Sequence, residues 1–201
     1  MKCVLLQAPG EILEGSAELN ELGYQAASYP VSQKVEKLLD TRCEEFTEFL
    51  GMHPEACDKP YVRVLRISFA NMILDPQFRE DDLIIFGESN TTPAIPEERL
   101  QPVLEEMVKS HPEVDVFRLF HEFSQEAPKP PCPWERIEFE PYATSGHTAG
   151  SAYVCGTHAL VIPASKREKV ARIFSTCRLP PDTALEAANG NGELSIMVTK
   201  Y

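Results

Sequence analysis

The sequence predicts a single α/β domain over residues 1–201, in which one mixed sheet is flanked by helices. Residues 83–86 form a short apolar run between turn-forming residues, which is typical of a strand buried on both faces. Strand-like and helix-like hydrophobic patterns alternate along the rest of the chain. A chain of 201 residues with 43% hydrophobic residues is also long enough for one sizeable core.

The N-terminal part of the chain predicts a strand, a helix and a second strand. Residues 2–7 are apolar, and a Pro-Gly pair follows them closely and ends the strand. Residues 11–22 have apolar side chains at helical spacing, and Gly23 is placed to end that helix. Residues 24–29 predict the second strand. This order is common at the start of nucleotide-binding α/β folds, although the sequence lacks G-x-G-x-x-G.

Two helices are predicted before the central strand. Residues 31–50 carry an apolar stripe at helical spacing, and a loop over residues 51–60 leads to a second helix over residues 61–74. Arg63 and Arg66 lie on nearby parts of one face of that second helix. Such a pair is most often solvated surface charge, and the alternative is a role near a ligand phosphate.

The second half of the chain continues the alternation of helices and strands. The prolines over residues 124–134 predict a stiff loop. Small residues at 146–152 lead into two apolar, strand-like runs that Gly156 separates. The other predicted elements are helices over residues 96–111 and 164–177, and strands over residues 114–119, 137–142 and 193–198.

Composition and charge argue against several classes of function. The chain has 31 acidic and 19 basic residues, a net charge of −12, so it should repel nucleic acids and anionic membranes. Its six cysteines are scattered without a Cys-x-x-Cys pair, which argues against a zinc site or a disulfide framework. No apolar run approaches the roughly 20 residues of a membrane span, and the first apolar stretch is too short for a signal peptide. We therefore expect a cytoplasmic protein without nucleic-acid partners or an integral membrane span.

The strongest candidate site follows the central strand. Ligands of α/β sheets bind outside the carboxyl ends of the strands. Asp81 and Asp82 precede the strand and so lie at the wrong end for a ligand. Glu88, Ser89 and Asn90 follow it directly after a glycine, which lets the backbone turn closely around a ligand. The alternative is structural, with Glu88 and Asn90 only ending the strand and capping a turn.

The chain carries three short motifs in a definite order. They are Phe86-Gly87-Glu88-Ser89-Asn90, then Gly150-Ser151-Ala152-Tyr153-Val154 with Ala159, and then Pro180-Pro181-Asp182. Together with Ser68, in the helix before the central strand, these motifs resemble the glycosyltransferases of the lipooligosaccharide type, numbered family twenty-five. Their order and spacing agree with the family over about residues 61–187.

The resemblance implies a glycosyltransferase-A-like, nucleotide-binding α/β fold and a part in lipopolysaccharide biosynthesis. The expected reaction moves a sugar from a nucleotide-sugar donor to a glycan or lipid-linked acceptor. Glu88, Ser89 and Asn90 are expected to bind the donor, and Ser68 and Arg66 are further candidate donor contacts. Glu88 and Asn90 would also hold a divalent cation, Mn²⁺ or Mg²⁺, which neutralises charge on the departing diphosphate.

Asp182 is the candidate catalytic residue on the acceptor side. The resemblance implies that it binds the acceptor or acts as a general base. The alternative is structural, since an aspartate after two prolines is a natural helix N-cap. Thr183-x-x-Glu186 then has the spacing of a capping box.

The chain departs from the family pattern at three places. Ser89 and Asn90 stand where carboxylates are expected, Phe69 stands in place of a histidine, and the first strand lacks an arginine-rich turn after it. One carboxylate makes a weaker metal site than two or three. The alternative function is therefore a catalytically degenerate relative that binds a partner or a glycan without turnover. A third hypothesis is an unrelated α/β nucleotide-binding module.

Overall fold

The computed structural model describes residues 1–8, 10, 13, 16–31, 60–78, 83–91, 95–119, 122–123, 137–142, 154–155, 157, 159–177 and 179–200. The strands are β1 (Lys2–Gln7), β2 (Gln25–Pro30), β3 (Ile84–Glu88), β4 (Val116–Arg118), β5 (Glu122–Phe123), β6 (Glu138–Pro141), β7 (Val154–Cys155), β8 (Leu160–Val161) and β9 (Ile196–Lys200). The α-helices are α1 (Ser16–Glu21), α4 (Pro60–Leu74), α5 (Glu97–Ser110), α6 (Arg167–Thr176) and α7 (Pro181–Gly190). Two short 3-10 helices are η1 (Pro76–Phe78) and η2 (Ala164–Lys166).

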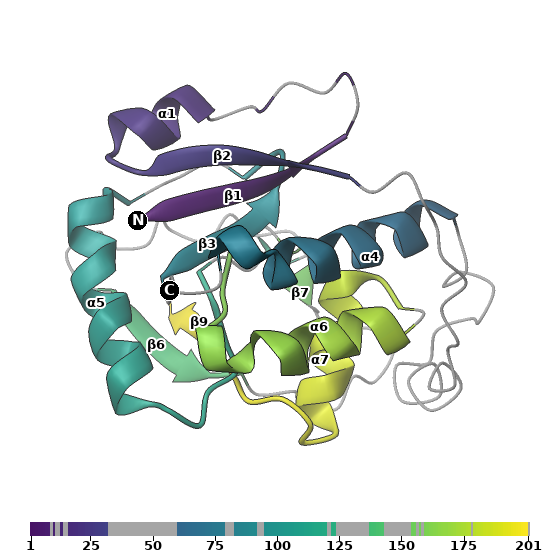
Figure 1. Cartoon of the computed structure of the whole chain (residues 1–201). Helices are drawn as coiled ribbons and strands as arrows, with labels where there is room; N and C mark the ends of the chain where they lie inside the picture. The colour runs from purple at the N-terminus through teal and green to yellow at the C-terminus, as the bar shows by residue number, and fades with distance from the viewer. Residues whose placement is uncertain are drawn as a thin grey trace.

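The described residues form an α/β fold around one mixed sheet (Figure 1). This sheet has seven strands in the order β2-β1-β3-β8-β4-β9-β6. β1 runs parallel to β2 and β3, with Cys3 paired to both Ala26 and Ile85. β8 is antiparallel to both β3 and β4, and β9 is parallel to β4. The carboxyl ends of β1, β3, β4 and β9 therefore lie at one edge of the sheet, which we call the carboxyl edge. β6 closes the sheet antiparallel to β9, and β5 pairs with β7 in a separate small sheet.

β3 has an interior position in the sheet, with β1 on one side and β8 on the other. Its side chains alternate between two core clusters, so that Ile84 and Phe86 lie in one and Ile85 lies in the other. The predicted central strand, buried on both faces, is confirmed. It begins at Ile84 and extends to Glu88.

Helices cover both faces of this sheet (Figure 1). α4, α6 and α7 pack against one another on the face that carries Phe86 and Val116, which we call the α4 face. The opposite face is covered by α1 and α5 through Leu19, Leu100 and Leu104. Within the described part of the chain, no helix has the length and apolar character needed to cross a membrane.

The hydrophobic pattern located most of the described elements to within a few residues. The predicted strands 2–7, 24–29, 114–119, 137–142 and 193–198 correspond to β1, β2, β4, β6 and β9. The predicted helices 61–74, 96–111 and 164–177 correspond to α4, α5, and η2 with α6. The two strands predicted around Gly156 are β7 and β8, which belong to different sheets. The helix predicted over 31–50, apart from Val31, and the loop predicted over 124–134 lie outside the described residues. So does the loop predicted over 51–60, apart from Pro60, which begins α4 and is not part of a loop.

Gly23 ends α1 as predicted. Its φ of +93° lies in the left-handed region that glycine adopts without a steric penalty. The Gly23 N–H donates to the Asn20 carbonyl at 3.1 Å, and the Tyr24 N–H donates to the Leu19 carbonyl at 2.9 Å. These two bonds form a Schellman motif, and the side chains of Leu19 and Tyr24 both lie in the core cluster beneath it.

Candidate functional site

The strand order reverses between β1 and β3. The chain passes from β1 to β2 on one side of β1 and later returns to β3 on its other side. In α/β sheets such a reversal opens a crevice outside the carboxyl ends of the strands, and ligands bind there. Gln7 ends β1, and Glu88 ends β3 beside its register partner Leu6. Glu88 therefore stands at the edge of the sheet where a ligand is expected.

The Glu88 carboxylate is held by Thr157, a residue far along the chain. The Thr157 backbone N–H donates to Glu88 Oε1 at 2.9 Å, and the Thr157 hydroxyl donates to the same oxygen at 2.5 Å. Thr157 is 1% exposed, whereas Glu88 is half-buried. No described residue donates to Glu88 Oε2. The two bonds to Oε1 thus give the carboxylate a defined orientation.

A tight turn follows β3. The Thr91 N–H donates to the Glu88 carbonyl at 3.0 Å, which closes the turn over the two intervening residues. Ser89 is half-buried and Asn90 is exposed. The structure thus brings Glu88, Ser89 and Asn90 together in one turn at the carboxyl edge.

The polar atoms of this turn fit a cation that arrives with a phosphate ligand better than a cation held by the protein alone. Glu88 Oε2 offers one charged oxygen, and Asn90 offers one neutral amide oxygen. The described residues contain no group of three His, Cys, Asp or Glu side chains that could hold a metal ion. Mg²⁺ commonly takes one or two protein carboxylates and completes its shell with substrate phosphates and water. Glu88 and Asn90 stay the predicted protein ligands of such an ion.

Arg66 and Ser68 lie on α4. Arg66 is 2% exposed, so its interpretation as solvated surface charge is wrong, whereas Arg63 is half-buried. Burial follows from its helical position, because Arg66 precedes the core residues Phe69 and Ala70 by three and four positions. The Ser68 hydroxyl is buried and donates to the Val64 carbonyl of the same helix at 2.7 Å. Contact of either side chain with a donor stays a prediction.

A second buried arginine, Arg118, ends β4 at the carboxyl edge. It is 0% exposed. Val116 lies in the core cluster of the α4 face and Phe117 in the opposite one, so strand alternation turns Arg118 towards the α4 face. The same alternation turns Glu88 towards that face, because Phe86 lies there. Arg66, Arg118 and Glu88 therefore approach one side of the sheet from three different elements.

Asp182 lies in the first turn of α7, and its interpretation as a helix N-cap is wrong. α7 begins at Pro181 with Pro180 as N-cap, because the fixed φ of proline suits the first helical position. The Asp182 carboxylate accepts the Thr183 N–H at 2.8 Å instead of capping the helix from outside. The capping box is also wrong, since the buried Glu186 accepts a hydrogen bond from the Tyr142 hydroxyl at 2.7 Å. A catalytic role for Asp182 stays a prediction.

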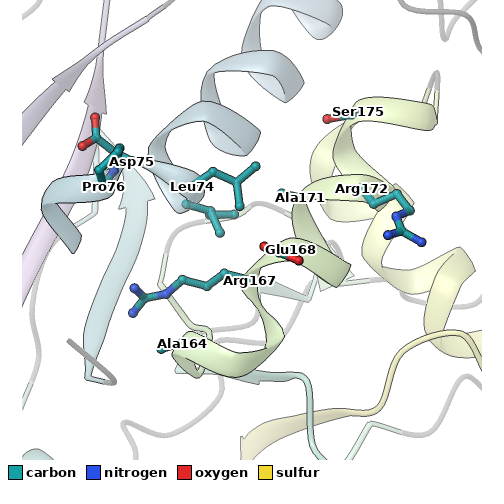
Figure 2. Close-up of a pocket in the computed structure, with 10 residues that line it drawn as sticks. Leu74, Asp75, Pro76, Ala164, Arg167, Glu168, Ala171, Arg172 and Ser175 are labelled. Carbon is teal, nitrogen blue, oxygen red and sulfur yellow. The ribbon is translucent and has the colours of Figure 1, made fainter. Parts of the chain in front are cut away.

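A cavity of about 510 Å³ lies between the C-terminal end of α4, η1 and α6 (Figure 2). Leu74 and Glu168 lie on its α4 and α6 sides, and none of the predicted site residues lines it. The buried Arg167 in its wall already bonds to the protein. Arg167 Nε donates to the Ile162 carbonyl at 3.2 Å, Nη1 donates to the Phe78 carbonyl, and the guanidinium lies 5.3 Å from the Phe86 ring centroid. We therefore assign Arg167 a structural role.

The described residues thus form an α/β fold whose strand order reverses between β1 and β3, the place where such folds bind ligands. Comparison of the chain with models of known protein families and with curated proteins finds no match. The glycosyltransferase resemblance therefore rests on the three motifs and stays a prediction.

Thr157 and Arg118 are the site residues that sequence reasoning missed. Thr157 lies between a glycine and a histidine in a segment that reads as an ordinary turn. Its contact with Glu88 spans 69 positions in the sequence, so no local pattern reveals it. Arg118 is a polar residue at the end of an apolar run, as Glu88 is at the end of β3. This position was the signal in the sequence that could have marked Arg118 as a site residue.

Proposed function

We propose that this protein is a glycosyltransferase with a glycosyltransferase-A-like fold that uses a nucleotide-sugar donor. The observation that carries the proposal is the Glu88-Ser89-Asn90 turn at the strand-order reversal between β1 and β3. The motif that resembles family twenty-five thus coincides with the place where the topology alone expects a ligand. The acceptor is a glycan or a lipid-linked glycan of the kind found in lipopolysaccharide.

The proposed roles follow from the chemistry of the leaving group. A nucleoside diphosphate leaves with negative charge, and a divalent cation bound with it would neutralise part of that charge. Glu88 presents Oε2 to the diphosphate or its cation, and Asn90 adds a neutral oxygen. Ser68 and Arg66 are assigned to the donor side, with the buried Arg66 as a fixed positive charge. Asp182 accepts the proton of the attacking acceptor hydroxyl.

The direct test is incubation with a panel of UDP- and GDP-sugars in the presence of MnCl₂. We expect at least one nucleotide sugar to raise the melting temperature and to be slowly hydrolysed to the nucleoside diphosphate. Glu88→Gln should weaken both effects, because it removes the charge that faces the ligand. Glu105→Gln removes the same charge from an exposed residue of α5 and serves as the control. Absence of both a thermal shift and hydrolysis across the panel would reject the proposal.

A second candidate function is that of a degenerate relative that binds its ligand without turnover. Two observations favour it: Glu88 Oε1 is already occupied by Thr157, and Asn90 brings no charge. This candidate predicts that a nucleotide sugar binds but is not hydrolysed over many hours. It also predicts that calorimetry with MnCl₂ in the presence of UDP detects no binding of the cation, whereas an active metal site gives a measurable dissociation constant.

A further inference from the structure

We propose that Thr157 is a positioning residue, which fixes the Glu88 carboxylate so that Oε2 meets a nucleoside diphosphate or its cation. This inference rests on the proposed function and deepens it. Thr157 itself is 1% exposed and so acts through Glu88, without touching the ligand.

The sheet explains why Thr157 reaches Glu88. β8 runs antiparallel to β3, and Leu160 pairs with Phe86. Because the two strands run in opposite directions, a residue shortly before Leu160 can lie beside a residue shortly after Phe86, as Thr157 does beside Glu88. The two residues are 69 positions apart in the sequence, and the β3–β8 ladder brings them together.

Two donors on one oxygen restrict the carboxylate strongly. The Thr157 N–H at 2.9 Å and its hydroxyl at 2.5 Å both point to Oε1. A glutamate has three side-chain torsions, and a free one would have to be ordered when a ligand binds. Because Thr157 has already ordered it, ligand binding avoids that cost. A side chain that is already ordered before binding lowers the dissociation constant about 3- to 10-fold relative to one that must be ordered on binding.

The competing explanation is that the bond only joins the start of β8 to the end of β3. In that case Thr157 contributes only to the stability of the fold. The bond then changes ligand binding only by changing the fraction of the protein that is folded. The two explanations differ in what happens when Glu88 is also replaced.

The experiment compares Thr157→Val and Thr157→Ser in calorimetric titrations with UDP and with GDP, each with MnCl₂. Thr157→Val keeps the shape and loses the hydroxyl, and we expect the dissociation constant to rise about 3- to 10-fold. Thr157→Ser keeps both donors and should recover most of the affinity. Ser110→Ala removes a hydroxyl that donates to the Glu106 carbonyl on α5, on the other face of the sheet, and is the control. Melting curves verify that each variant is folded.

The same titrations in a Glu88→Gln background separate positioning from stability. If Thr157 acts through Glu88, Thr157→Val causes no further loss of nucleotide affinity in the Glu88→Gln background. The inference is overturned if Thr157→Val binds like the parent, or if it weakens binding equally in both backgrounds. If Thr157→Val does not fold, Thr157→Ala replaces it in the same cycle. A parent protein that binds neither nucleotide overturns the proposed function as well, so the two failures are distinguishable.

Discussion

Asn90 is the residue at which the charge of the candidate site can be changed most cleanly. It is exposed in the turn after β3 and brings a neutral oxygen beside the single carboxylate of Glu88. A divalent cation gains far more from a charged oxygen than from an amide oxygen. The cation affinity of this turn should therefore depend on the one atom in which asparagine and aspartate differ.

Asn90→Asp should tighten Mn²⁺ binding, because it adds a second negative ligand. A charge-assisted contact of this kind contributes on the order of 1–3 kcal/mol, which corresponds to roughly a 5- to 150-fold change in dissociation constant. Calorimetry with MnCl₂ measures it. Asn191→Asp adds the same charge at an exposed position after α7 and should leave the affinity unchanged. Equal binding by Asn90→Asp, Glu88→Gln and the parent would show that the carboxyl edge is not a cation site.

At the scale of elements, α7 joins the far edge of the sheet to the helices of the α4 face. The Tyr142 hydroxyl, just after β6, donates to Glu186 Oε1 at 2.7 Å. Asn189 donates to the Tyr142 carbonyl at 3.1 Å and accepts the Ile196 N–H at 3.1 Å. One turn of α7 thus connects β6 and β9, and its orientation also determines where Asp182 lies.

Tyr142→Phe should lower the free energy of unfolding by about 1–3 kcal/mol, because the buried Glu186 carboxylate loses a hydrogen-bond donor. Urea denaturation measures the change as a shift in the midpoint of the transition, while the dependence of the unfolding free energy on urea concentration stays constant. In a Glu186→Gln background the acceptor is neutral, and we expect the same tyrosine substitution to cost less. An unchanged midpoint in Tyr142→Phe would mean that solvent replaces the hydroxyl at no cost.

Elements were predictable where hydrophobic spacing alone determines them. β1, β3 and α4 follow this rule, because their apolar residues repeat with the period of a strand or a helix. The start of α7 was not, since either Pro181 or Asp182 has a residue type suited to a helix start. Helical spacing places Arg66 on the same face as Phe69 and Ala70, but its burial also depends on the helices that pack over α4. The position of Glu88 was predictable from topology, but its bond to Thr157 depends on strand pairing across the whole sheet.

At the scale of the whole molecule, a buried thiol and a buried phenol limit stability in alkaline solution, because both are uncharged in the folded protein. Burial raises the pKa of the Cys3 thiol from its ordinary value of 9.0 to about 12. Burial also raises the pKa of the Tyr24 hydroxyl, and the neighbouring Cys3 and Glu97 add to the shift. Both groups lie in the core cluster under α1 and α5, where an anion has no compensation.

Stability should therefore fall as the pH rises above about 9. Below the ordinary pKa of 9.0 the Cys3 thiol is protonated in both the folded and the unfolded chain, and its contribution to the free energy of unfolding is complete. Between that pH and about 12, the unfolded chain loses the proton while the folded chain keeps it, which favours unfolding. The slope is about 1.4 kcal/mol per pH unit for one group. Urea titrations at pH 8, 9 and 10 measure it, and Cys3→Ala should remove the share of Cys3. An equal decline in Cys3→Ala would assign the effect to other groups.

The two-residue strand β8 stands between two halves of the seven-stranded sheet. On one side lie the parallel strands β1, β2 and β3, and on the other lie β4, β9 and β6. β8 joins the halves through short ladders, in which Phe86 and Arg118 both pair with Leu160. These ladders have two register pairs each, fewer than the other ladders of the seven-stranded sheet, so we expect them to open more readily than the ladders on either side. The hydrogen bonds from Thr157 to Glu88 lie directly beside the β3–β8 ladder. A chain in which this ladder has not formed therefore lacks these hydrogen bonds. Ligand affinity at the carboxyl edge is then a measure of completed folding, and amide exchange at Leu160 and Val161 should slow in step with it.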